Sequence, residues 1–454
     1  MKSVALHNLG CKVNSYELDV MQQILRERGY VIVPFDHIAD IYIVNTCTVT
    51  NIADRKSRQM LHRAKQLNPN AVVVAVGCYV QTGRETIEKD DCIDLAIGNN
   101  RKKDIVVILE QFLKERDAYA DKQQVSGRDK TLHGAAVPDI GRVDEYEEMT
   151  LKRTSEHTRA YIKIQDGCNQ FCSYCAIPYA RGRVRSRRQA DVLGEIRGLV
   201  DSGFKEVVLT GIHLSSYGID FEGKKAYSGE SSLIDLVEQV HDISGLERIR
   251  MGSLEPRVVT EETARRLSSL SKLCPHFHLS LQSGSDTVLK RMNRHYTVGE
   301  YYTSVEYLRK YFDHPAVTTD IIVGFPGETE EEFAETAAFL EKICFYEMHI
   351  FKYSKRAGTV AASMPAQVPD QIKTERSNIL LDMERRQSVK FRQRYIGGEV
   401  EVLLEEEKDI GGISYLVGHT KDYVNVAVKS AEGLQVNEIV KVHVKDMLTE
   451  EILV

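Results

Sequence analysis

Apolar residues in the first 115 positions form short β-branched runs that alternate with longer amphipathic stretches. Such runs predict buried strands of a parallel sheet, and the stretches between them predict helices. We expect strands at residues 4–6, 41–44, 72–76 and 95–97. A first helix is expected over residues 15–28, with Asn14 as its N-cap and Gly29 at its end, and a second over residues 53–67.

The next 38 residues, 116–153, are polar and charged without a sustained period. They predict a linker with some local helix. A strand or hairpin over residues 141–148 is the alternative.

Residues 154–385 repeat a strand followed by a helix six times. The expected strands are residues 160–164, 207–209, 247–251, 276–281, 317–323 and 348–351. Helices are expected between them, for example over residues 190–201 and 330–342. Six such units predict an incomplete form of the eight-stranded barrel, in which chemistry takes place at the carboxyl ends of the strands.

The pattern changes after a basic helix expected near residues 382–394. Residues 386–454 then carry short strands separated by Gly, Asp and Asn turns, at residues 399–404, 415–420, 423–428 and 439–444. They predict a small all-β barrel, in the size class of nucleic-acid-binding barrels. The fold class is therefore α/β, with an N-terminal parallel-sheet domain, a central partial (βα)6 barrel and a C-terminal all-β barrel.

Composition narrows the class of protein. The chain is 42% hydrophobic and 28% charged, and no stretch approaches 18 apolar residues, so we expect a cytoplasmic protein without a membrane span. Nine cysteines, an odd number, favour metal or redox chemistry over a disulfide framework. The net charge of -6 leaves nucleic-acid binding to local basic patches.

Three cysteines lie in one loop after the first barrel strand. The segment GCNQFCSYCAIP places Cys168, Cys172 and Cys175 in a C-x3-C-x2-C spacing with no fourth ligand nearby. A 4Fe-4S cube held by three thiolates keeps one iron open for catalysis. A zinc site with a distant fourth ligand, or a chance grouping, is the alternative.

A second trio follows the strands of the N-terminal domain. Cys11, Cys47 and Cys78 each come two to five residues after an expected parallel strand, so the three thiols should converge at one sheet edge. We interpret them as ligands of a second 4Fe-4S cluster, with three buried structural cysteines as the alternative. The other three cysteines share no such pattern and are expected in the core or at the surface: Cys92, Cys274 and Cys344.

The cysteine loop, with Tyr174 just before its last cysteine, resembles the signature of the radical S-adenosylmethionine superfamily. The resemblance implies that the open iron binds S-adenosylmethionine and that an electron releases a 5′-deoxyadenosyl radical. Turns after later strands should then hold this cofactor, and a tight turn or a satisfied polar group is the alternative for each. The candidate cofactor-binding residues are Tyr174, Gly211, His213, Ser253, Glu255 (for the ribose) and Gln282.

Six segments in order resemble the methylthiotransferases over nearly the whole chain: LGCKVN, NTCTV, VGCY, GCNQFCSYC, RGRVRSR and VGFPGETEEEF. The family resemblance implies two clusters, two molecules of S-adenosylmethionine per reaction, a C-terminal TRAM domain, a sulfur source and a reducing protein such as flavodoxin or ferredoxin. The segments CKVN, TGIH and RSR resemble those of the subgroup that acts on threonylcarbamoyladenosine at position 37 of tRNA. Isopentenyladenosine in tRNA, a ribosomal protein side chain, and a zinc-bearing RNA-binding module without enzymatic activity are the alternatives.

Three basic runs are candidates for phosphate contacts, each with a solvated helix face as the alternative. They are Arg181, Arg183, Arg185, Arg187 and Arg188; Arg55, Lys56, Arg58, Arg63 and Lys65; and Arg385, Arg386, Lys390, Arg392 and Arg394. Some arginines of the first run are alternatively carboxylate ligands of the cofactor. Tyr415 and Tyr423 either stack on bases or belong to the core.

Overall fold

The computed structural model describes residues 2–120, 136–152, 158–221, 232–430 and 433–454. The chain divides into two compact units. The first unit comprises Met1–Thr154, Lys163–Asp191 and Ser354–Ala362, and the second comprises Ser155–Ile162, Val192–Tyr353 and Ser363–Val454. Within the expected linker, residues 121–135 and 153 lie outside the described part.

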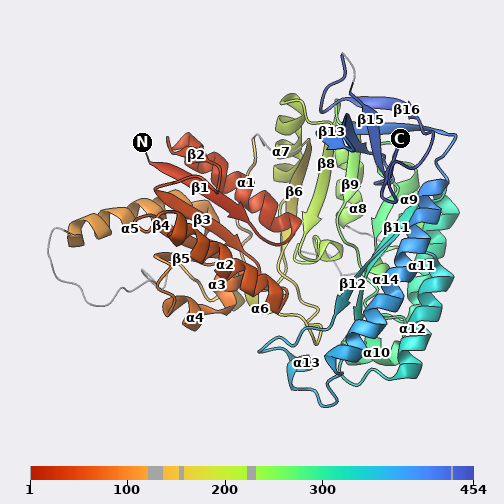
Figure 1. Ribbon diagram of the computed structural model, residues 1–454, viewed down its shortest axis with the longest axis horizontal. Helices are drawn as coiled ribbons and strands as arrows, with labels where there is room; N and C mark the ends of the chain where they lie inside the picture. The colour runs from red at the N-terminus through yellow and green to blue at the C-terminus, as the bar shows by residue number, and fades with distance from the viewer. Residues whose placement is uncertain (1, 121–135, 153–157, 222–231, 431–432) are drawn as a thin grey trace. The chain divides into compact units, whose positions relative to one another are not determined.

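The first unit is built on a five-stranded parallel sheet in the order β2-β1-β3-β4-β5 (red and orange in Figure 1). Its strands are β1 (Ser3–Asn8), β2 (Val31–Val33), β3 (Ile41–Thr46), β4 (Val72–Gly77) and β5 (Leu95–Ile97). Its helices are α1 (Lys12–Glu27), α2 (Asn51–Leu67), α3 (Cys78–Thr82), α4 (Arg84–Glu88) and α5 (Ile105–Ala120). All six residues of β3 and of β4 are buried, as expected for central strands covered on both faces.

One local expectation for this unit, the Asn14 cap, is wrong, and the alternative of a strand at residues 141–148 is excluded. Helix α1 begins at Lys12 with Cys11 as N-cap, so Asn14 lies inside the helix. The Asn14 side chain instead donates hydrogen bonds to the carbonyls of Leu9 and Thr46, which ties the helix start to the ends of two strands. Residues 141–148 form no strand, and the structure has a single 3-10 turn at Ile140–Arg142.

The six expected barrel strands are all present and follow one another around two sheets. They are β6 (Arg159–Asp166), β8 (Glu206–Gly211), β9 (Arg248–Met251), β10 (His276–His278), β11 (Ala316–Val323) and β12 (Glu347–Lys352). The sheet orders are β7-β6-β8-β9 and β10-β11-β12, and parallel bridges at Ile249–Leu273 and Leu254–Leu279 join β9 to β10. This confirms the partial (βα)6 barrel, to which β7 (Arg185–Ser186) adds a short antiparallel pairing.

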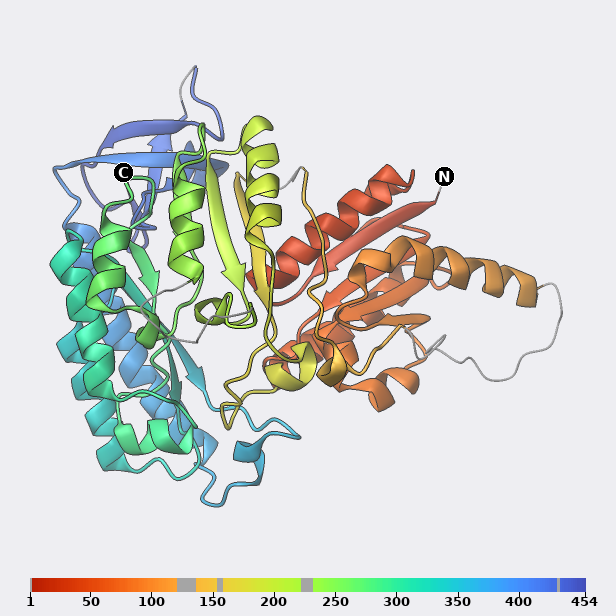
Figure 2. The same cartoon turned by 180° about the vertical axis from the view of Figure 1, so that it is seen from behind.

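Helices follow the barrel strands, as the repeat predicts. They are α6 (Ile177–Arg181), α7 (Gln189–Asp201), α8 (Ser232–His241), α9 (Glu261–Ser268), α10 (Asp286–Arg291), α11 (Val298–Tyr311), α12 (Glu330–Ile343), α13 (Val360–Ser363) and α14 (Asp370–Gln393). Helix α14 packs against α12 and against the strands β11 and β12, and its blue ribbon lies beside the teal helices in Figure 2. No described helix is both long enough and apolar enough to cross a membrane.

A five-stranded C-terminal sheet in the order β16-β13-β14-β15-β17 completes the second unit. Its strands are β13 (Glu399–Ile410), β14 (Ile413–His419), β15 (Asn425–Lys429), β16 (Ile439–His443) and β17 (Ile452–Leu453). All pairs are antiparallel except β15 with β17. Its core includes Leu404, Leu416 and Val426, and these pack with Phe391 at the end of α14.

Candidate functional site: two cysteine trios

The loop that carries Cys168, Cys172 and Cys175 is backed by the RGR segment. Gly167 has φ +71°, and a Cβ there would lie 1.8 Å from the carbonyl oxygen of Arg183, so only glycine fits. The Cys168 amide donates to the carbonyl of Gly182 at 3.0 Å. Close backbone packing therefore holds the start of the cysteine loop, which explains why GC and RGR occur together.

Amide groups of the loop point at its sulfur atoms. The amide of Gln170 donates to Cys168 Sγ, and the amide of Ile177 donates to Cys175 Sγ, each at 3.5 Å. Such donors favour a negatively charged sulfur, the form that binds metal. The donor set suits a cluster held by three thiolates.

Strand register brings the second trio to one edge of the first unit's sheet. Thr46 of β3 pairs with Gly77 of β4, so Cys47 and Cys78 each lie one residue beyond a paired position. Cys11 caps α1 after β1, whose Asn8 pairs with Asn45. A Cβ on Gly10 would lie 3.1 Å from Cys47 Sγ, so the first loop passes directly against the second cysteine.

The thiols of this trio influence one another. The pKa of the Cys47 thiol is raised to about 11, chiefly by burial and in smaller part by the nearby Cys78 and Cys11. Burial and neighbouring thiols disfavour a free thiolate, and a metal centre relieves this by taking up the charge. The structure thus brings Cys11, Cys47 and Cys78 together, although their role as ligands stays a prediction.

A buried group of charged residues lies beside the second trio. Glu17 of α1 forms ion pairs with Lys102, Lys163 and Arg181, and all four side chains are at most 1% exposed. Asp166 accepts from Lys163 at 2.7 Å and from Arg181 at 3.3 Å. Although burial alone would raise the pKa of Glu17, these three cations hold it well below its usual range, so Glu17 stays ionised.

The second unit places five of the cofactor-binding candidates at or just after the carboxyl ends of β8, β9 and β10. His213 Nε2 lies 3.1 Å from Glu255 Oε2, and His213 Nδ1 lies 2.6 Å from Ser216 Oγ. Gly211 is the last residue of β8, Ser253 is exposed, and Gln282 has φ +73°. Hydrogen bonds from His213 and Arg257 hold the pKa of Glu255 well below its usual range despite its burial. Tyr174 belongs to the first unit, between Ser173 and Cys175.

The structure corrects part of the RNA-contact hypothesis. Arg181, Arg185 and Arg187 are at most 1% exposed and have partners inside the protein, so they offer nothing to a phosphate. Arg183 and Arg188 are exposed, as are Arg55, Lys56 and Arg63 on α2. In the third run Arg392 is buried against Glu347, whereas Lys390 and Arg394 are exposed.

Both barrel tyrosines are engaged inside the second unit. Tyr415 is 3% exposed and packs in a cluster with Val417 and Ala427. The Tyr423 ring stacks on His276 and His419, with Arg159 and Arg250 also over it. The core interpretation is therefore correct for Tyr415, whereas Tyr423 is half-buried and engaged by these histidines and arginines.

Sequence reasoning missed Arg356, which the structure places beside the second trio. Its guanidinium donates to Thr48 and to Asp54 of the turn and helix that follow Cys47. Five residues further along the chain, the amide of Ala361 donates to the carbonyl of Ser173 at 2.8 Å. Residues 354–362 therefore connect the Cys47 turn with the first cysteine loop. No local pattern could reveal this, because the contact spans 308 positions between Thr48 and Arg356.

A second missed feature is a group of polar side chains on three neighbouring barrel strands. His278 of β10 pairs with Asp320 of β11 at 3.3 Å, and its ring stacks on His349 of β12 with centroids 5.8 Å apart. Residues on the other face of these strands, such as Leu279, Ile321 and Met348, are buried. Polar and apolar residues alternate in HFHLSLQ, residues 276–282, and this alternation predicts a strand with one polar face.

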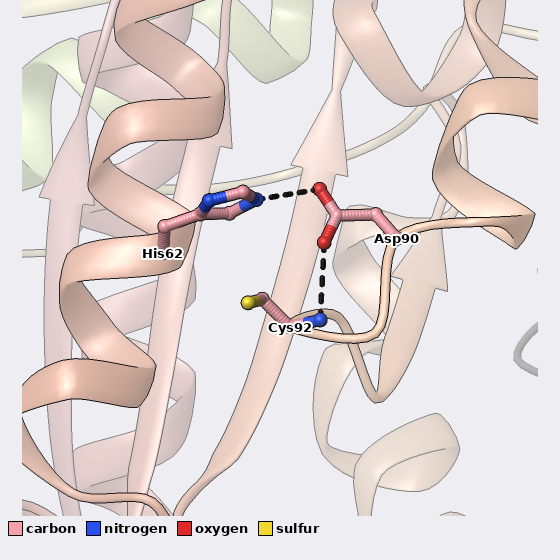
Figure 3. Close-up of side chains that lie close together, drawn as sticks. All are labelled: His62, Asp90 and Cys92. Carbon is pink, nitrogen blue, oxygen red and sulfur yellow. Dashed lines mark hydrogen bonds and ion pairs between the residues drawn. The ribbon is translucent and has the colours of Figure 1, made fainter.

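Only two groups of three metal-type donors within 4.8 Å of one another occur among the described residues. One is the barrel group above, and the other is His62, Asp90 and Cys92 at the surface of the first unit (Figure 3). His62 Nε2 lies 2.9 Å from Asp90 Oδ2, and the His62 side chain is 48% exposed. Neither cysteine trio is among these groups.

Cys92 provides a matched test of which cysteines carry iron. Cys92→Ser is expected to leave iron and sulfide content unchanged, because Cys92 lies with His62 and Asp90 rather than with either trio. Cys47→Ser, by contrast, should lower iron by about half, since a cluster needs its thiolates. The check is iron and sulfide analysis of anaerobically purified protein. A parallel loss of iron in Cys92→Ser would contradict the assignment.

Comparison with known proteins agrees with these features. Residues 162–340 match the Radical SAM superfamily, and residues 3–98 match the Uncharacterized protein family UPF0004. The chain is 40% identical over 445 residues to threonylcarbamoyladenosine tRNA methylthiotransferase MtaB of Bacillus subtilis (strain 168), covering 98% of this chain and 94% of that protein. It is 36% identical over 454 residues to the MtaB protein of Thermotoga maritima, covering 100% and 96%.

A relative of lower identity and a solved structure also match the chain. The chain is 33% identical over 451 residues to tRNA-2-methylthio-N(6)-dimethylallyladenosine synthase of Carboxydothermus hydrogenoformans, covering 98% and 97%. The radical S-adenosylmethionine methyltransferase TsrM of Kitasatospora setae has a TM-score of 0.54 at 17% identity, over 77% of this chain and 75% of that one. Membership of the superfamily implies one 4Fe-4S cluster and S-adenosylmethionine. The resemblance inferred from the motifs is confirmed: this chain belongs to the family of radical S-adenosylmethionine tRNA methylthiotransferases.

Proposed function

We propose that this enzyme replaces hydrogen with a methylthio group at carbon 2 of N6-threonylcarbamoyladenosine at position 37 of tRNA. The observation that carries the proposal is the presence of two cysteine trios in one compact unit, one in the C-x3-C-x2-C loop and one at the sheet edge. The base is proposed from relatives that carry this substrate in their names.

The first trio, Cys168, Cys172 and Cys175, is proposed to hold a 4Fe-4S cluster with one open iron. When bound there, such a cluster supplies the electron that cleaves S-adenosylmethionine to a carbon radical. In the second unit, Glu255 is ionised and held by His213 and Arg257, so its oxygens are set to accept from ribose hydroxyls. Gly211, Ser253 and Gln282 are proposed as further cofactor contacts in the second unit, and Tyr174 is proposed as a cofactor contact in the first unit.

The second trio, Cys11, Cys47 and Cys78, is proposed to hold a second 4Fe-4S cluster whose open iron takes the sulfur to be transferred. Three features of the chain suit it: Gly10 allows close approach, Ser57 hydrogen-bonds the backbone of Cys47, and Arg181 donates to Cys78. The reaction consumes sulfur and electrons, so we propose a sulfur source and a reducing protein such as flavodoxin or ferredoxin as partners. A tRNA substrate places the reaction in the cytoplasm.

For tRNA, we propose phosphate contacts by the exposed cations that follow each trio. Arg55, Lys56 and Arg63 project from α2 after Cys47, and Arg183 and Arg188 follow Cys175. Each neutralised phosphate releases counterions, so affinity for tRNA should fall steeply with salt.

The test is anaerobic incubation of the reconstituted enzyme with S-adenosylmethionine, dithionite, sulfide and tRNA bearing threonylcarbamoyladenosine. The digested product should contain a base heavier by a methylthio group in place of hydrogen, with the methyl label retained when methyl-labelled S-adenosylmethionine is used. The matched substrate is the same tRNA bearing isopentenyladenosine. A product only from that tRNA would replace the proposed base, and no product from either would reject tRNA methylthiolation.

Loss of the Glu255 charge should weaken binding of S-adenosylmethionine. Glu255→Gln keeps the shape but removes a charge-assisted acceptor, which is worth about 1.5–3 kcal/mol. We expect the Kd for S-adenosylmethionine to rise roughly ten- to hundredfold. The measurement is equilibrium binding to reconstituted protein between pH 6 and 8. Because the pKa of Glu255 is held well below its usual range, wild-type affinity should show no titration of this group there. Unchanged affinity in the variant would remove Glu255 from the site.

A further inference from the structure

Arg181 makes a direct contact with a sulfur of the second trio. Its Nε lies 3.2 Å from Cys78 Sγ, and the guanidinium is fully buried. The two terminal nitrogens are occupied by Glu17, Asp166 and Asn14. The orientation of the Nε–H toward the sulfur is therefore set by three further side chains, Asn14 and Glu17 of α1 and Asp166 of β6, and does not depend on Cys78 alone.

The surroundings of Arg181 carry more positive than negative charge. The buried cations Lys102, Lys163, Arg181 and Arg185 face two ionised carboxylates, Glu17 and Asp166. Burial raises the pKa of a third carboxyl, Glu147, which opposes its ionisation. Buried charge is costly unless it is paired, so this pocket favours a further anion. The sulfur to which Arg181 points is where that anion would lie.

We propose that Arg181 is a positioning residue for the second cluster: its Nε–H hydrogen-bonds the Cys78 sulfur, and its charge stabilises the more negative, reduced form. The inference rests on the second cluster of the proposed function. Hydrogen bonds to ligand sulfurs, net charge and solvent exclusion are the factors through which a protein sets the reduction potential of an iron-sulfur cluster. Arg181 supplies all three at one ligand.

Arg181 lies on the same short segment of the chain as the first trio. It ends α6, six residues after Cys175, so the segment 168–181 carries the first trio and also touches the second. Asn99 also reaches Cys78 Sγ, at 3.6 Å, and donates to the carbonyl of Ala180 at 2.7 Å. Asn99 is neutral, and its longer contact makes it a comparison for the effect of a hydrogen bond without charge.

The experiment uses the full-length chain with Cys168, Cys172 and Cys175 replaced by alanine, so that only the second cluster can form. On this background Arg181→Lys, Arg181→Gln, Asn99→Ala and Arg183→Gln are reconstituted anaerobically. Iron and sulfide content and the midpoint potential, followed by electron paramagnetic resonance, are then measured. Arg183 is two residues from Arg181 but is exposed, so Arg183→Gln is the matched control.

We expect the midpoint potential to move to more negative values in Arg181→Lys, further in Arg181→Gln, and least in Asn99→Ala, with Arg183→Gln unchanged. Arg181→Lys keeps a cation for Glu17, so it tests the sulfur contact even if the glutamine variant does not fold. An unchanged potential in Arg181→Lys at full iron content would overturn the role of Arg181 while leaving the second cluster in place. Absence of iron from the background variant would overturn the second cluster itself, and the inference with it.

Discussion

Cys172→Ala is expected to abolish cleavage of S-adenosylmethionine and to lower the iron content from about eight to about four atoms per chain. The first loop offers three thiolates within eight residues and no fourth, so losing one leaves two ligands for a cluster that must also bind the cofactor. The second trio lies at the edge of the first unit's sheet and not in this loop, so we expect it to keep its proposed cluster. Iron analysis and chromatographic detection of 5′-deoxyadenosine check both parts.

Cys47→Ala provides the reciprocal control. It should also lower iron to about four atoms per chain, yet it should retain cleavage of S-adenosylmethionine while forming no methylthio product. The two variants therefore have equal iron and opposite activities if each trio holds one cluster. Loss of cofactor cleavage in both variants at full retention of the other cluster would contradict the division of roles.

Glu17→Ala is expected to be the most destabilising single substitution in the first unit. Glu17 is 1% exposed and pairs with Lys102, Lys163 and Arg181, so its removal leaves buried cations without their anion. Breaking a buried ion pair from one side costs about 3–5 kcal/mol. Urea unfolding followed by circular dichroism should show a markedly lower midpoint, together with reduced iron at the second trio.

Glu110→Ala is the matched comparison for Glu17→Ala. Glu110 pairs with Arg28, whose side chain is 58% exposed, and such a surface pair contributes about 0–1 kcal/mol. A midpoint change as large for Glu110 as for Glu17 would show that burial of the charge is not the cause.

The same carboxylates give stability a defined dependence on pH. The pKa of Glu17 is held well below its usual range, and Lys163 and Arg181 lower the pKa of Asp166 to about 2 despite its burial. A folded-state pKa below the unfolded value means that the stabilisation is fully present above about pH 5 and is lost as pH falls toward 2. Between pH 5 and 8 the unfolding midpoint should therefore show no titration of these two groups, and Glu17→Gln should flatten the loss on acidification.

Local sequence patterns were sufficient for the elements that carry both trios. Fully apolar runs predicted β3 and β4, and glycines before Cys11 and Cys78 indicated close approach at the strand ends. The convergence of the three thiols of the second trio followed from a general property of parallel sheets, in which the carboxyl ends of the strands share one edge. The strand β2, only three residues long and partly exposed, escaped because so short a run has no period to detect.

Charged residues were harder to interpret than apolar ones. Arg181, Arg185 and Arg187 have the composition of a phosphate-binding run, yet all three are buried. Their partners Glu17, Asp166 and Glu148 lie from 15 to 164 positions away, so no local window distinguishes a buried ion pair from a solvated cation. Asn14 is a second residue whose role depends on distant partners. Its side chain donates to carbonyls at the ends of two strands and therefore does not cap the helix.

The order of strands and helices, the cysteine spacing and the family were readable from the chain alone, because periodicity and short motifs are local properties. Only the folded structure revealed the contact of Arg181 with Cys78, the link from Arg356 to the Cys47 turn, and the enclosure of Tyr423 between histidines and arginines. These contacts join residues more than a hundred positions apart in most cases. Their existence depends on which side chains the packing removes from water, and that is decided by the tertiary fold.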